Sequence, residues 1–152
     1  MKVLATAGVL TVALIGCAYK PGTFRNQRGH FLGERHTVGC LDVAVRRMHD
    51  AVATGTVAAV AFGNRCDQPT TIDLAAIRAI AYAADGTISS PALRDPDGVI
   101  QPTRIGARKS GTEYLEYQTK TAVAQLCLDL TRVDAEARKP HAAIVCMNGS
   151  QL

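Results

Sequence analysis

Short stretches in which apolar and polar residues alternate recur along the chain between residues 38 and 147. The clearest lies in residues 123–133, where every second residue from 126 to 130 is leucine. An alternation with a period of two predicts a half-buried β-strand. Asp-Gly pairs at 85–86 and 97–98 suit tight hairpin connections between such strands. The pattern therefore predicts an all-β fold, an immunoglobulin-like antiparallel sandwich.

Two segments can also be interpreted as helices. Residues 70–84 contain many alanines, which favour a helix, although their large apolar residues stand at even positions, as on one face of a strand: Ile72, Leu74, Ile80 and Tyr82. Residues 41–53 are equally ambiguous, because several of their apolar residues also fit helical spacing: Leu41, Val45, Met48 and Val52. The alternative fold is therefore α+β, with helices near residues 41–53 and 72–84.

The first 17 residues differ in character from the rest of the chain. One positive charge, Lys2, precedes an apolar run over residues 3–15, and the polarity rises abruptly after Cys17. This order is typical of a secretory signal peptide, and the run is well short of the roughly 20 residues that cross a bilayer as a helix. Leu14-Ile15-Gly16-Cys17 resembles the lipobox of bacterial lipoproteins. The resemblance implies removal of residues 1–16 and a lipid on Cys17; the alternative is an ordinary signal with a chance cysteine.

The lipobox divides the remaining chain into a tether, a domain and a tail. Residues 17–37 comprise the lipidated cysteine and a polar, glycine-containing segment without apolar periodicity, which predicts a flexible basic tether. This tether would serve either as a solvated linker or as a contact for anionic lipid head groups. We expect the β-sandwich in residues 38–148 and a short polar tail in residues 149–152.

Composition indicates how such a domain would be stabilised. The chain has no Trp and few other aromatic residues, so its core must consist largely of aliphatic side chains. With Cys17 assigned to lipid, an even number of cysteines remains in an exported chain, which predicts two disulfides. A zinc site is the rival interpretation, but the paired Cys-x-x-Cys spacing of zinc ribbons is absent.

We expect one bridge between Cys127 and Cys146, because a single strand register satisfies both the bridge and the core. Residues that face each other in an antiparallel hairpin have a constant sum of sequence numbers. Pairing these two cysteines therefore sets Leu128 against Val145 on the other face of the hairpin, as one of several apolar pairs.

The second expected bridge joins Cys40 to Cys66. Its side-chain matching is poorer, because the same rule sets Val43 against Gly63 and requires a bulge. The competing connectivity links the first strand to the last, with the pairs Cys40–Cys146 and Cys66–Cys127.

The sequence favours neither catalysis nor metal binding, and we expect no cofactor. Glu113 and Glu116, the closest carboxylate pair in the C-terminal half, would point to opposite faces of a strand. Asp95 and Asp97 begin like a calcium loop, but Gly98 and two apolar residues follow at once, which favours a turn. Loss of the leader lowers the formal net charge from +4 to +3, and no basic stripe interleaves with aromatics, so nucleic acid is not an expected partner.

From residue 39 onward the chain resembles, in broad outline, small uncharacterised lipoproteins of Gram-negative bacteria. The matching segments are Gly39-Cys40-Leu41-Asp42, Gly63-Asn64-Arg65-Cys66, Ile72-Asp73-Leu74 and residues 113–117. The resemblance implies a place in the cell envelope, with the membrane bound through the N-terminal lipid. Ala18, rather than Asp, follows the lipobox, which implies the outer membrane with the domain facing the periplasm.

The leading hypothesis is a non-catalytic structural module that docks onto an unknown envelope protein through sheet edges or loops. Because Tyr and Arg are favoured interface anchors, the candidate interface residues are Arg104, Arg108, Tyr114 and Tyr117. Tyr114 and Tyr117 would lie on opposite strand faces, so at most one is expected to be exposed. The alternative is a membrane-tethered periplasmic carrier of a small molecule or lipid, which needs an apolar pocket of roughly 300–1,000 Å³.

Overall fold

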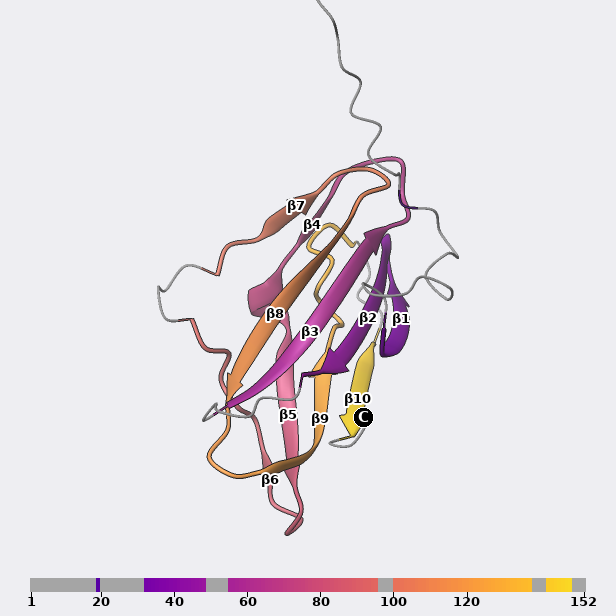
Figure 1. Ribbon diagram of the computed structural model, residues 1–152. Helices are drawn as coiled ribbons and strands as arrows, with labels where there is room; N and C mark the ends of the chain where they lie inside the picture. The colour runs from indigo at the N-terminus through magenta and orange to yellow at the C-terminus, as the bar shows by residue number, and fades with distance from the viewer. Residues whose placement is uncertain (1–18, 20–31, 49–54, 96–99, 138–141, 149–152) are drawn as a thin grey trace, which may run out of the picture.

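The structure, a computed structural model, describes residues 19, 32–48, 55–95, 100–137 and 142–148. Two four-stranded antiparallel sheets pack against each other (Figure 1). The first sheet has the order β1-β2-β3-β8, with the bounds Glu34–Val38, Leu41–Arg47, Gly55–Asn64 and Ser110–Gln118. The second has the order β10-β9-β5-β6, with the bounds Ile144–Asn148, Val123–Asp129, Arg78–Ala83 and Ile88–Ser89. A small third sheet pairs β4, Thr70–Ile72, with β7, Thr103–Ile105.

The predicted all-β sandwich is confirmed. In the second sheet, β5 and β9 pair across a long stretch of sequence, as do β3 and β8 in the first, which is the Greek-key connectivity of immunoglobulin-like folds. The helical alternative is wrong within the described residues. Residues 41–47 form β2, and residues 72–83 form the end of β4, one short 3₁₀ turn at Leu74–Ala76 and β5.

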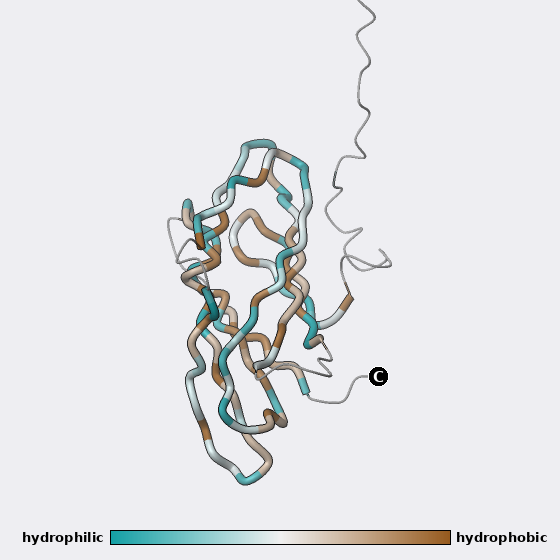
Figure 2. Tube along the Cα trace, turned by 60° about the vertical axis from the view of Figure 1, so that its left-hand side comes forward, coloured by the Kyte–Doolittle hydropathy of each residue, from teal (hydrophilic) through white to brown (hydrophobic). Residues whose placement is uncertain are grey.

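The core lies between the inner faces of the two sheets. Aliphatic side chains fill most of it, in keeping with the absence of Trp, and among the described residues the fully buried aromatic rings are Phe62 and Tyr117. In Figure 2, apolar segments lie along the strands and many of the turns are hydrophilic. Within the described part of the chain, no buried side-chain nitrogen or oxygen lacks a hydrogen-bond partner.

The domain begins earlier than the sequence predicted. β1, Glu34–Val38, lies inside the segment interpreted as a tether and pairs with β2 along its whole length. The two strands are joined by a two-residue turn at Gly39, whose φ of 56° favours glycine because other residues seldom adopt it. The expected signal peptide, Cys17, most of the expected tether and residues 149–152 lie outside the described residues.

Both disulfides have the favoured pairing, Cys40–Cys66 and Cys127–Cys146. The Cys127–Cys146 disulfide joins β9 and β10 in the expected register, with Leu128 opposite Val145. The first does not set a register, because Cys40 precedes β2 and Cys66 follows β3. The predicted bulge is therefore wrong: β2 and β3 pair regularly, and Val43 lies opposite Phe62 rather than Gly63.

Candidate functional site

Strand β5 turns its larger side chains away from the core. Ala79 and Ala81 are buried, whereas Ile80 and Tyr82 are only partly buried, on the outer face of the second sheet. Although Ile72 and Leu74 share their parity, those two residues are buried. The 3₁₀ turn at Leu74–Ala76 breaks the strand and changes the phase of the alternation. The expectation that all four residues share one face is therefore wrong.

The outer face of the second sheet consequently carries several large apolar side chains among polar ones. Three cross-strand rows run over it: Arg78–Asp129–Ile144, Ile80–Cys127–Cys146 and Tyr82–Gln125–Asn148. Ile88 of β6 lies opposite Tyr82 and extends the third row. Ile88 is 63% exposed and Ile144 is 56% exposed. We call these three rows together with Ile88 the outer face.

The second disulfide lies in the centre of the outer face. It links β9 to the edge strand β10, between the rows of Arg78 and Tyr82. Because both cysteines sit in paired strands, the bond holds the exposed Ile144 at a fixed place in the sheet. A surface that is already ordered before binding loses less conformational entropy when a partner covers it.

The residues predicted as an interface do not come together. Tyr117 is 1% exposed, its hydroxyl donates to the carbonyl of Ile77, and its burial raises its pKa, so it cannot offer contact surface. Tyr114 is 63% exposed on the outer face of the first sheet. Arg104 lies on β7 of the small third sheet, and Arg108 lies in the loop between β7 and β8, paired at 2.9 Å with Asp67. The expected exposure of only one tyrosine is confirmed.

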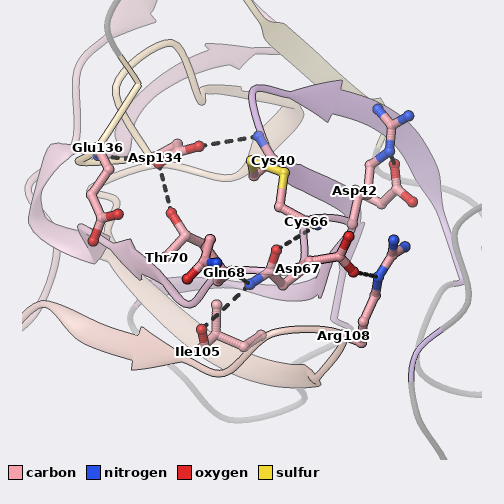
Figure 3. The surroundings of a disulfide bond; sticks show 12 residues. Cys40, Asp42, Cys66, Asp67, Gln68, Thr70, Ile105, Arg108, Asp134 and Glu136 are labelled. Atoms are coloured by element: carbon pink, nitrogen blue, oxygen red, sulfur yellow. Dashed lines mark hydrogen bonds and ion pairs between the residues drawn. A yellow bond between two sulfur atoms is a disulfide. The ribbon is translucent and has the colours of Figure 1, made fainter.

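A polar network surrounds the first disulfide (Figure 3). The carboxylate of Asp134 accepts hydrogen bonds from the Thr70 hydroxyl at 2.9 Å and from the backbone N–H of Cys40 at 3.2 Å. Asn64 is fully buried and connects the loops that follow β3 and β7. These hydrogen bonds hold this end of the sandwich together.

Tyr19 is a functional candidate that the sequence interpretation assigned to the tether. It is 4% exposed and packs on the outer face of the first sheet, in a small cluster with Ala44 and Ala61. A Cβ atom on Gly63 would lie 2.3 Å from the Cζ atom of the Tyr19 ring, so glycine is required beneath the ring. Its backbone N–H donates to the carbonyl of Arg108 at 2.6 Å.

The Tyr19 hydroxyl donates to the buried carboxylate of Asp42. Asp42 also accepts from the Thr37 hydroxyl at 3.0 Å and pairs with Arg65 at 3.5 Å. Burial, and secondly the hydrogen bond to Asp42, raise the pKa of Tyr19, so the phenol remains a neutral donor. We call the residues around this ring, Asp42, Ala44, Ala61 and Gly63, the Tyr19 seat.

Several open grooves lie on the surface. One of about 850 Å³ lies between the β5–β6 hairpin and the end of β8 and is rich in hydroxyl groups, from Thr87, Ser89, Ser90, Thr119 and Thr121. Arg94 and Glu116, also in its lining, form an ion pair at 2.8 Å. Such a lining suits a polar molecule better than the lipid considered from the sequence.

Across residues 19, 32–48, 55–95, 100–137 and 142–148, no group of three or more His, Cys, Asp or Glu side chains is placed to hold a metal ion. No helix in that part of the chain is long and apolar enough to cross a membrane.

Comparison with known proteins yields a likeness of fold. No family model matches the sequence, and no curated protein matches it. YcdA, a candidate lipoprotein of Bacillus subtilis, has a similar structure with a TM-score of 0.51 and 18% identity; the match covers 76% of this chain but only 38% of YcdA. YjhA of Bacillus subtilis has a TM-score of 0.49 and 11% identity, and the match covers 76% of this chain and 96% of YjhA.

Proposed function

We propose that this chain is a membrane-anchored lipoprotein of the cell envelope whose sandwich docks onto another envelope protein through the outer face, without catalysis of its own. The observation that carries the docking surface is the orientation of β5, which buries Ala79 and Ala81 and leaves Ile80 and Tyr82 at the surface. Large apolar side chains that gather on one face of a small domain are favoured at protein interfaces.

Three observations support the anchor. Leu14-Ile15-Gly16-Cys17 has the form of a lipobox at the end of a secretory leader. The two disulfides suit an oxidising space such as the periplasm. The fold neighbour YcdA is itself a candidate lipoprotein. The proposed location is the periplasmic side of the outer membrane, which rests on Ala18 in the position where Asp would signal retention at the inner membrane.

The chemistry of the outer face favours a protein as its partner. Its two charged side chains, Arg78 and Asp129, lie opposite each other in one row, so the face has no net charge. An anionic polymer or lipid head group would find no excess of positive charge there. Tyr82 lies between the polar Gln125 on β9 and the exposed Ile88 on β6. An aromatic side chain with apolar and polar neighbours is a common anchor in protein–protein interfaces.

The anchor is tested by replacing its cysteine. We expect Cys17→Ser to release the protein from membrane fractions or to leave the leader uncleaved, because the serine hydroxyl cannot take the thioether-linked lipid. Intact-mass measurement of the membrane-extracted natural protein should show an acylated N-terminal Cys17. An unmodified N-terminus at any other residue would contradict the lipoprotein assignment.

The docking face is tested by site-specific photo-crosslinking in living cells. Ile88 and Tyr114 form a matched pair of probe sites, because each is 63% exposed and they lie on different sheets. We expect a probe at Ile88 to give a discrete adduct with one envelope protein, and a probe at Tyr114 to give none. Adding Tyr82→Asp to the Ile88 probe should weaken the adduct about tenfold, since loss of an aromatic anchor costs more than about 1.4 kcal/mol.

The melting temperature of the Tyr82→Asp variant is the control. If the variant still melts cooperatively, a weaker adduct reports loss of docking rather than loss of structure. Equal adducts from both probe sites, or an Ile88 adduct that is indifferent to Tyr82→Asp, would overturn the assignment of the outer face.

The hydroxyl-rich groove supports a second candidate function, capture of a polar small molecule. Its volume of about 850 Å³ lies in the usual range of ligand sites, and Lys120, which lines the same groove as the Arg94–Glu116 pair, supplies charge. Native mass spectrometry of protein purified from the envelope distinguishes the two functions. A stoichiometric small molecule that is lost on Lys120→Glu would favour the carrier.

A further inference from the structure

The Tyr19 seat fixes the position of the chain very near the proposed lipid. Tyr19 is held by burial of its ring, by the hydrogen bond from its hydroxyl to Asp42 and by the hydrogen bond from its N–H to Arg108. Cys17 precedes it by two residues, and two residues of fully extended chain span at most about 7 Å. A lipid on Cys17 would therefore enter the membrane within a few ångströms of the first sheet.

We infer that the Tyr19 seat holds the sandwich against the membrane in one orientation, with the loops after β3 and β7 facing the lipid head groups. The inference rests on the proposed lipid anchor. The occupant of this surface is the membrane that carries the Cys17 lipid, because the linking chain is too short to reach past the domain. Three basic residues lie in these two loops, Arg65, Arg108 and Lys109; Arg65 pairs with Asp42 and Arg108 pairs with Asp67.

The opposite end of the sandwich then points away from the membrane. β3 runs from Gly55 to Asn64, and ten residues of strand span roughly 30 Å. Gly55 pairs with Gln118 of β8, which lines the same groove as the β5–β6 hairpin. Figure 1 shows β6 at the end of the molecule opposite the tip of β3. Ile88 would thus stand clear of the lipid and accessible to a partner in the periplasm.

The absence of Trp from the chain allows a direct measurement of orientation. Two exposed positions serve as single fluorescent probes, Lys109→Trp near the Tyr19 seat and Ile88→Trp at the far end. Each full-length lipidated variant is placed in vesicles of phosphatidylethanolamine and phosphatidylglycerol that contain a lipid with a nitroxide on its head group. We expect quenching several-fold stronger at position 109, because the nitroxide acts only at short range.

Two glycines provide a matched pair for breaking the seat. Gly63→Ala places a Cβ 2.3 Å from the Tyr19 ring and should expel the ring, whereas a Cβ on Gly111, which lies in β8 opposite Phe62, meets nothing within 4 Å. We expect Gly63→Ala to abolish the difference in quenching between the two probes and Gly111→Ala to preserve it. Tyr19→Ala should act like Gly63→Ala and repeats the test in a variant with an unaltered strand.

Each outcome decides a separate point. Equal quenching at positions 109 and 88 in the lipidated natural background would overturn the orientation. A difference that survives both Gly63→Ala and Tyr19→Ala would overturn the role of the Tyr19 seat. Absence of quenching at both positions, together with an unacylated Cys17 by intact mass, would instead refute the lipid anchor and the proposed function.

Discussion

Reduction of both disulfides is expected to unfold much of the protein at 37 °C. The two bridges close chain segments with sequence separations of 26 and 19. By the chain-entropy estimate each contributes about 3 kcal/mol, and together they match much of the 5–15 kcal/mol of net stability of a typical domain. The double variant Cys127→Ala/Cys146→Ala should retain the other bridge and melt roughly 10 °C below the natural protein.

Calorimetry of the soluble domain with and without reductant measures the first effect. A variant in which all four bridging cysteines are alanine is the control, and its melting temperature should not respond to reductant. Cys146 is exposed but Cys127 is buried, so the loss in the double variant reports the cross-link together with the packing of Cys127. An unchanged melting temperature of the natural protein on full reduction would show that the aliphatic core suffices without covalent bonds.

Asn64→Asp is expected to destabilise the domain by more than about 3 kcal/mol at pH 7, since each buried group left unsatisfied costs about 1–3 kcal/mol. The Asn64 amide N–H₂ donates to the carbonyls of Gln68 at 2.8 Å and Gly106 at 3.0 Å, and its oxygen accepts from the N–H of Cys66 at 2.9 Å. The carboxylate introduced by Asn64→Asp would still accept from the Cys66 N–H, but it would replace the donating amide group with a negatively charged oxygen that faces the carbonyls of Gln68 and Gly106.

The pH dependence of this variant identifies the cause. Burial among acceptors raises the pKa of the introduced carboxyl in the folded state, so the folded state binds its proton more tightly than the unfolded state. The penalty should therefore be smallest below about pH 4, the ordinary pKa of an Asp, and should grow as the pH rises above it. Chemical denaturation at several pH values measures this trend.

Asn148→Asp is the matched control, because Asn148 is exposed and its side-chain oxygen already accepts from Gln125 at 2.8 Å. The same chemical change at that position should alter stability by less than about 0.5 kcal/mol at any of these pH values. If both variants lost similar stability, the buried donor of Asn64 would not be the origin of the effect.

The two proposed surfaces are compatible with each other. The Tyr19 seat lies on the first sheet near the end of β3, whereas the outer face lies on the second sheet and reaches the β5–β6 hairpin. A domain held at the membrane by the first surface leaves the second one free for a partner. The two disulfides divide in the same way, since one braces the loops near the seat and the other lies within the outer face.

The sequence by itself determined the fold class and the C-terminal hairpin. The alternating leucines of residues 126–130 place the core on one side of β9, and the parity of Cys127 and Cys146 then admits a single register, which the structure confirms. The Asp-Gly pair at 85–86 likewise predicted the β5–β6 turn, where Gly86 has a φ of 84°. These features depend on neighbours in the chain, whose geometry a local pattern specifies.

Tertiary structure alone decided the two surfaces on which the proposals rest. A period of two shows that side chains alternate, but the face of β5 that becomes core depends on the 3₁₀ turn before it and on packing against β9. β1 has no apolar alternation and forms because the edge of β2 supplies its hydrogen bonds. Tyr19 is buried only because Gly63, 44 positions further along the chain, leaves room for its ring. Contacts between such distant residues depend on the folded backbone, and no local pattern of residues encodes them.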